Sequence, residues 1–134
     1  MIPDNVRAFL EEPHYVVMAT INASGTSQLT VMWYALHPTE DVVLLNGSRG
    51  LLKVKNLRRD PRMALCVEDG TRYVTLEGTA ELIEDRVEQE REVNDHIAPR
   101  YIGQRLGSQR WEAIKKSDRM GIRMRIEKIH ARGL

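Results

Sequence analysis

The chain has 134 residues and a near balance of charge, with 20 Lys and Arg against 19 Asp and Glu and a formal net charge of +1. This length predicts one domain over residues 1–134, and the balance excludes a general electrostatic attraction to nucleic acid or to anionic membranes. The single cysteine excludes an internal disulfide, and no signal peptide or bilayer-spanning run is present, so we expect a cytoplasmic protein without membrane partners.

The first third of the chain predicts a short helix followed by a β-hairpin. Residues 1–13 have the apolar spacing of a helix that Pro13 ends. Residues 15–21 and 27–36 read as two strands joined by a turn at 22–25. The second strand is apolar on both faces, with Leu29, Val31, Trp33 and Ala35 on one and Met32, Tyr34 and Leu36 on the other. One face can line a core, while the other needs a ligand, a helix or a second subunit to cover it.

The stretch from Asn46 to Pro61 predicts an anion site. It follows a third strand at 42–45 and begins with small, flexible residues, after which apolar residues recur every three positions. We expect a short helix from Leu51 that ends at Asp60-Pro61, with Arg49 and Lys53 on the same side of its first turn. The site would combine these cations with Gly47, Ser48 and Gly50. The alternative is a solvated basic face, because the stretch matches neither a Walker loop nor a dinucleotide fingerprint.

The second half of the chain predicts another hairpin, a helical insertion and a closing strand. Residues 62–67 and 73–83 form the hairpin, and Gly78 marks a bulge, a barrel corner or a close backbone approach. Residues 84–97 predict a charged surface helix that Pro99 breaks, and residues 100–116 a second helical piece. A sixth strand begins at Met120. Six short strands joined mostly by hairpins predict an α+β domain, mainly antiparallel and barrel-like, with short peripheral helices.

Four segments, taken in order, carry a resemblance to a known family. They are Val-Val-Met-Ala-Thr-Ile-Asn-Ala-Ser-Gly at 16–25, Val-Met-Trp-Tyr at 31–34, Asn-Gly-Ser-Arg-Gly-Leu-Leu-Lys-Val-Lys-Asn-Leu-Arg-Arg-Asp-Pro-Arg at 46–62 and Leu-Glu-Gly-Thr-Ala-Glu-Leu at 76–82. The chain resembles the flavin/deazaflavin split-barrel oxidoreductases, the pyridoxamine-phosphate-oxidase-like superfamily. The resemblance implies a six-stranded split β-barrel that forms a homodimer, with cofactor sites at the subunit interface.

The resemblance also implies which residues hold the cofactor. The ring would be lined by Thr30, Val31, Met32 and Trp33. The phosphate would be wrapped by Asn46, Gly47, Ser48, Arg49 and Gly50. Arg49 and Lys53 would neutralise the phosphate, and Lys55 would reach a more distal charge. The reduced ring would pass a hydride to a small conjugated organic acceptor, and we expect neither a catalytic side chain nor a metal site in the protein.

The choice of cofactor rests on differences from the FMN-dependent pyridoxamine phosphate oxidases. Those enzymes usually carry an arginine at the start of the second strand and an Arg-Leu-His type segment near the C-terminus, where this chain reads Gln-Leu-Thr-Val-Met-Trp and Ile-His-Ala-Arg. The chain is more similar to the small branch that uses the deazaflavin coenzyme F420, whose anionic tail suits Lys55, Arg58 and Arg59. The alternatives are FMN in the same site, or a non-catalytic module that binds a flavin, haem or tetrapyrrole.

Overall fold

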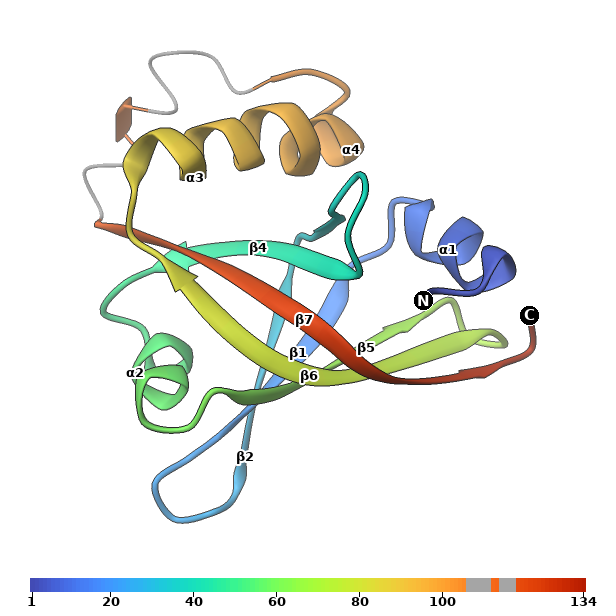
Figure 1. Cartoon of the computed structure of the whole chain (residues 1–134), viewed down its shortest axis with the longest axis horizontal. Helices are drawn as coiled ribbons and strands as arrows, with labels where there is room; N and C mark the ends of the chain where they lie inside the picture. The colour runs from blue at the N-terminus through green and yellow to red at the C-terminus, as the bar shows by residue number, and fades with distance from the viewer. Residues whose placement is uncertain (106–111, 114–117) are drawn as a thin grey trace.

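One curled antiparallel sheet forms the body of the protein in a computed structural model, which describes residues 1–105, 112–113 and 118–134 (Figure 1). The strands are β1 (Val16–Ile21), β2 (Ser27–Met32), β3 (Ala35–Leu36), β4 (Val42–Ser48), β5 (Arg62–Glu68), β6 (Tyr73–Ile83) and β7 (Arg119–Arg132). Their order across the sheet is β2-β1-β5-β6-β7-β4-β3. The predicted α+β split-barrel fold is confirmed, with seven strands in place of six.

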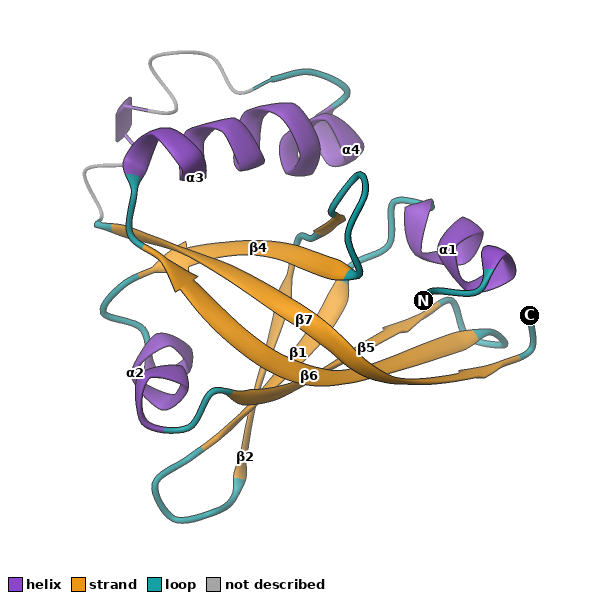
Figure 2. Ribbon diagram, in the orientation of Figure 1, coloured by secondary structure: helices purple, strands orange, loops and turns teal. Residues whose placement is uncertain are grey.

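The helices lie at the periphery of the sheet (Figure 2). They are α1 (Asp4–Glu11), α2 (Leu52–Arg59), α3 (Arg86–Glu92), the π-helical turn η1 (Val93–Ile97) and α4 (Ala98–Ile102). The main core lies between α1, α2 and the concave face of the sheet, and it includes Phe9, Met18, Leu45, Leu57 and Met124. A smaller apolar cluster joins β3 and β4 to η1 and α4. No described helix is long and apolar enough to cross a membrane.

The predicted strand at 27–36 is divided into β2 and β3. The side chain of Tyr34 is buried and its hydroxyl donates to the carbonyl oxygen of Leu10 at 2.7 Å, while its backbone N–H donates to the hydroxyl of Tyr101 at 3.2 Å. These contacts with distant parts of the chain draw the backbone out of the ladder. The prediction of two apolar faces is confirmed, because Met32 lies in the core whereas Val31 is 66% exposed.

Gly78 allows two neighbouring backbones to approach closely. The register between β6 and β7 shifts at Glu77/Gly78, and a Cβ atom at position 78 would overlap the carbonyl oxygen of Arg125. The prediction of a bulge or close approach at this glycine is therefore confirmed.

The insertion between β6 and β7 differs from its prediction at one point. Pro99 does not end the helical run, because α3, η1 and α4 follow one another without a break. Pro99 lies in the first turn of α4, where its missing N–H removes no necessary hydrogen bond. Leu106, Trp111 and Ile114 of the predicted second helical piece lie outside the described residues.

Candidate functional site

The predicted anion site lies where β4 ends, α2 begins and β7 starts (Figure 1). β4 and β7 pair in antiparallel register, with Ser48 opposite Arg119 and Asn46 opposite Gly121. The chain then turns through residues 49–51, and Leu51 is the N-cap of α2. This arrangement places Lys53 in the first turn of α2, directly beside the end of β4.

Lys53 is a buried cation without a counter-charge. Its side chain is 7% exposed, and among the residues that the structure describes it has no hydrogen bond or ion pair. The aliphatic stem lies over Gly47, where a Cβ atom would stand 3.1 Å from Cε of Lys53. Burial lowers the pKa of Lys53, and the positive charge of Arg119 lowers it further. Glycine at position 47 therefore provides the space for a lysine whose ammonium group is poorly solvated.

Arg119 brings a second cation to the same place. Its Nε donates to Oδ1 of Asn46 at 2.9 Å, and its Nη1 lies 3.3 Å from Oγ of Ser48. Both partners are neutral, no carboxylate in the described part of the chain pairs with Arg119, and burial lowers the pKa of its guanidinium. Sequence reasoning missed this residue, because its position depends on the pairing of β4 with β7 across 71 residues.

Gln89 of α3 orients the side chain of Asn46. Gln89 is 1% exposed, and its Nε2 donates to the carbonyl oxygens of Glu84 and Arg119 at 3.1 and 3.3 Å. Its Oε1 is left to accept from Nδ2 of Asn46 at 3.0 Å, so Oδ1 of Asn46 faces Arg119. The buried amide of Gln89 thus determines that Arg119 meets the side-chain oxygen of Asn46 and not its nitrogen. The sequence offered no signal for this role, since Gln89 stands within a highly charged helix.

Arg49 is placed differently from the prediction. It precedes α2 and does not share the helix's first turn with Lys53, because the helix begins at Leu52. Nη1 of Arg49 lies 3.3 Å from Glu84 Oε1, and its Nε lies 3.2 Å from Asp118 Oδ1 without donating a hydrogen bond. Its charge is therefore balanced within the chain, whereas that of Lys53 is not. Gly50 is exposed beside it.

The predicted ring-lining residues divide between two faces of the sheet. The methyl group of Met32 would lie 4.0 Å from a Cβ atom at Gly47, and Thr30 shares the face of Met32 because it is two residues away in β2. Val31 points to the opposite, exposed face. Trp33 stacks on Tyr101 with 4.8 Å between ring centroids.

The structure brings some of the predicted cofactor-binding residues together and separates others. Gly47, Lys53 and Met32 meet on one face at the end of β4, with Thr30 on the same face of β2 as Met32. Asn46 and Ser48 point to the opposite face, where they contact Arg119. Lys55 is exposed and lies about 200° around α2 from Lys53, so it projects away from the buried cation.

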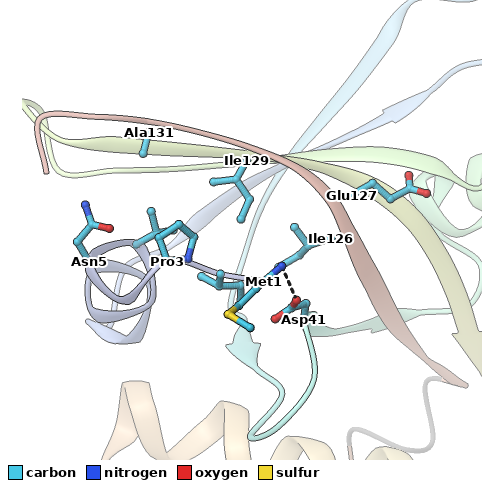
Figure 3. Close-up of a pocket in the computed structure, with 10 residues that line it drawn as sticks. Met1, Pro3, Asn5, Asp41, Ile126, Glu127, Ile129 and Ala131 are labelled. Atoms are coloured by element: carbon cyan, nitrogen blue, oxygen red, sulfur yellow. Dashed lines mark ion pairs between the residues drawn. The ribbon is translucent and has the colours of Figure 1, made fainter.

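A separate pocket of about 500 Å³ opens between the start of α1, the turn before β4 and the strand β7 (Figure 3). Its walls include Ile126, Ile129 and Ala131, and the amino group of Met1 lies 3.1 Å from Oδ2 of Asp41 at its edge. None of the predicted site residues lines this pocket. We therefore place the candidate site at the end of β4.

The chemistry of the site fits a phosphate group. Lys53 is buried and Arg119 is partly buried, and neither has a carboxylate partner among the described residues, so an anion would compensate both charges. The hydroxyl of Ser48 and the N-terminal turn of α2 supply further hydrogen-bond donors. The methyl group of Met32 and the stem of Lys53 both lie against Gly47, so an apolar side chain borders the lysine, as a cofactor with a planar ring requires.

Comparisons with known proteins agree with this fold. The family model of pyridoxamine 5'-phosphate oxidase matches residues 2–133. The chain is 26% identical over 100 residues to an F420H2-dependent biliverdin reductase of Mycobacterium tuberculosis, covering 75% of this chain and 72% of that protein.

Two solved structures share the fold over nearly the whole chain. A conserved hypothetical protein of Mycobacterium tuberculosis superposes with a TM-score of 0.82 and 28% identity, covering 98% of this chain and 84% of its own. A protein described as an F420 reductase superposes with a TM-score of 0.77 and 26% identity, covering 96% of this chain and 98% of its own.

Proposed function

The chain belongs to the pyridoxamine 5'-phosphate oxidase family, and from this premise we propose that it is an oxidoreductase that uses F420 to reduce a small conjugated organic molecule. The family, predicted from four sequence segments, is confirmed, and its relatives support an oxidoreductase with a flavin or deazaflavin cofactor. F420 itself and the class of acceptor are our proposal.

The observation that carries the proposal is the unpaired, buried Lys53 beside Arg119. Burial of Lys53 beside a second cation costs stability without a compensating contact. A phosphate bound between them would be held by charge-assisted hydrogen bonds in a poorly solvated place, where such bonds are strong. Lys53 and Arg119 are therefore the residues that we assign to the cofactor phosphate, with Ser48 as an additional donor.

The relatives favour F420 over FMN. A curated relative is named for its use of F420H2, and a solved structure of similar length is described as an F420 reductase. Exposed cations on α2, namely Lys55, Arg58 and Arg59, lie on the surface that leads away from Lys53 and suit an anionic tail. FMN lacks this tail, so it would use the buried cations alone.

The chain's own residues act by binding and orientation. When bound, the reduced cofactor supplies a hydride to the acceptor. Lys53 and Arg119 fix the phosphate end, and Met32 and Thr30 offer one apolar and one polar side chain to the ring. Asn46 and Gln89 hold Arg119 in place. This division of work follows the general rule that the cofactor carries the reaction and the protein positions it.

We also propose that the protein forms a homodimer through the convex face of β1 and β2. Tyr15, Val17, Leu29 and Val31 are exposed there, and Val17 pairs directly with Val31 in the sheet. Exposed apolar side chains gathered on one sheet face are typical of an interface. A second copy would cover this face. The sequence had instead placed the face in need of cover on the side of Met32, Tyr34 and Leu36, which the structure buries in the core.

Fluorescence titration with F420 and with FMN, followed by turnover, tests the proposal. We expect the oxidised and reduced forms of F420 to bind and the reduced form to be consumed when a quinone, an enone or biliverdin is added. A protein that purifies yellow and retains FMN through gel filtration would identify the FMN alternative. Binding without turnover of any of these acceptors would identify a non-catalytic module, and binding of neither cofactor would overturn the proposal.

A further inference from the structure

A line of side-chain hydrogen bonds runs from α2 across β1 to β2. Nδ2 of Asn56 donates to Oγ1 of Thr20 at 3.1 Å, and Thr20 donates to Oε1 of Gln28 at 3.0 Å. Nε2 of Gln28 then donates to Oγ1 of Thr30 at 2.7 Å. Asn56 and Thr20 are almost completely buried, so the line begins inside the protein. It ends at Thr30, which is partly exposed.

The direction of this line is determined at its buried end. Nη2 of Arg59 lies 3.2 Å from Oδ1 of Asn56, and a guanidinium can only donate, so Oδ1 must be the acceptor. The amide nitrogen of Asn56 therefore faces Thr20 and also donates to Oδ1 of Asn22 at 3.0 Å. Both N–H groups of the Asn56 amide are therefore used. If the amide were reversed, its nitrogen would face the guanidinium of Arg59, and two donors would meet.

The following bonds run in the same direction in the structure. Oγ1 of Thr20 accepts from Asn56 and donates its own proton to Oε1 of Gln28. The amide nitrogen of Gln28 then faces Thr30, whose oxygen accepts. The hydroxyl proton of Thr30 has no acceptor among the described residues. The line thus terminates in a donor whose direction the protein has set in advance.

This terminal donor lies on the face of β2 that borders the anion site. Thr30 and Met32 are two residues apart in one strand, so their side chains share a face. The methyl group of Met32 lies near Gly47, against which the stem of Lys53 also packs. Asn56, at the other end of the line, is one helical turn after Lys53 in α2. Lys53 and the hydrogen-bonded line therefore border the same region from two elements.

We propose that Thr30 donates a hydrogen bond to the ring of the cofactor, at a carbonyl oxygen or an unprotonated ring nitrogen. The inference rests on the proposed function, because it needs a ring whose phosphate is held at Lys53 and Arg119. It specifies how the ring is oriented, because an acceptor atom of the ring must face β2. Asn56, Thr20 and Gln28 are then positioning residues, since their hydrogen bonds keep Thr30 a donor.

The test compares variants of Thr30 in the full-length protein. Thr30→Val keeps the shape of the side chain and removes the hydroxyl, whereas Thr30→Ser keeps the hydroxyl. Thr79→Val, at a partly buried threonine of β6, is the matched control. The dissociation constants of F420, FMN and riboflavin are measured by fluorescence, together with the absorption maximum of each bound ring. Riboflavin has the ring of FMN and no phosphate, so it reports on the ring contact alone.

We expect Thr30→Val to weaken all three ligands by about 3- to 10-fold, the scale of one lost neutral hydrogen bond, and to shift their bound absorption maxima. Thr30→Ser restores both readouts, and Thr79→Val leaves them at wild-type values. Gln28→Glu gives a second measurement that leaves Thr30 intact: its carboxylate draws the hydroxyl proton of Thr30 inward, and we expect the same loss and spectral shift.

The outcomes separate this inference from the proposed function. If the wild-type protein binds the ligands and both Thr30→Val and Gln28→Glu bind them with unchanged affinity and spectra, the assignment of Thr30 is overturned while the proposed function stands. If the wild-type protein binds none of the three, both fail. A loss of affinity in Thr30→Val that Thr30→Ser does not restore would also overturn it, because a packing defect would then explain the loss.

Discussion

Replacement of Lys53 by methionine separates binding from stability at the candidate site. Methionine keeps an unbranched apolar stem over Gly47 and removes the charge. A charge-assisted hydrogen bond to a phosphate contributes about 1.5–3 kcal/mol, so we expect the variant to bind FMN or F420 about 10- to 150-fold more weakly. The upper half of this range applies if the ammonium group meets the phosphate directly, because the side chain is only 7% exposed and little water competes.

The same substitution has the opposite effect on the unliganded protein. Lys53 is buried without a partner among the described residues, and the positive charge of Arg119 acts on it, so removal of the lysine charge relieves an unfavourable interaction. We expect the free energy of unfolding to rise by about 1 kcal/mol, which corresponds to about 3–5 °C in melting temperature for a domain of this size. Urea unfolding and thermal melting of the cofactor-free protein measure this change.

Lys55→Met is the matched control for Lys53→Met. Lys55 lies two residues further along α2 and is exposed, so its loss should leave FMN affinity and stability near wild type. With F420 we expect a smaller, salt-sensitive loss if the anionic tail passes over α2. A Lys53→Met variant that is less stable than wild type and binds FMN with unchanged affinity would refute the reasoning, since Lys53 would then be a packing residue.

Three further predictions address pH, the sheet and the interface. The folded state lowers the pKa of Lys53, so the stability gain of Lys53→Met should be full near neutral pH and disappear as the pH rises towards the ordinary lysine value of 10.5, as urea unfolding of both proteins would reveal. Gly78→Ala forces a Cβ atom against the carbonyl oxygen of Arg125 and should cost about 2–4 kcal/mol by urea unfolding, whereas Gly50→Ala, with open space around it, should cost under about 1 kcal/mol; equal costs would contradict the close approach. Val31→Glu should convert a dimer to a monomer in sedimentation velocity, and a wild-type protein that is already monomeric would remove the proposed interface.

Local sequence patterns were sufficient for most of the elements. The period of apolar residues located α1, α2 and the hairpin strands, because each of these buries one face that its own residues define. The division between β2 and β3 was missed because it depends on Tyr34, whose partners Leu10 and Tyr101 are 24 and 67 residues away. The pattern of apolar residues within one strand does not predict such long-range contacts.

In the candidate site, too, the residues that are close in sequence were predicted and the distant ones were not. Lys53 and Gly47 were predicted from a stretch in which loop, glycine and cation are neighbours in sequence. Arg119 was not, because only the register of β7 against β4 brings it to Ser48. The pairing of Arg49 with Glu84 was not predictable from the sequence either, and it left Lys53 as the buried cation of this stretch that has no partner among the described residues.

The central place of β7 in the sheet has a consequence for biosynthesis. β7 follows the other described strands in the sequence, yet it lies between β6 and β4 and joins two groups of strands that have no other ladder between them in the described part of the chain. Until it docks, a nascent chain exposes two open strand edges, and Arg119 has not reached the end of β4. Cofactor capture that uses Arg119 should therefore follow the synthesis of β7, and chains truncated before residue 119 should be substrates for chaperones and proteases.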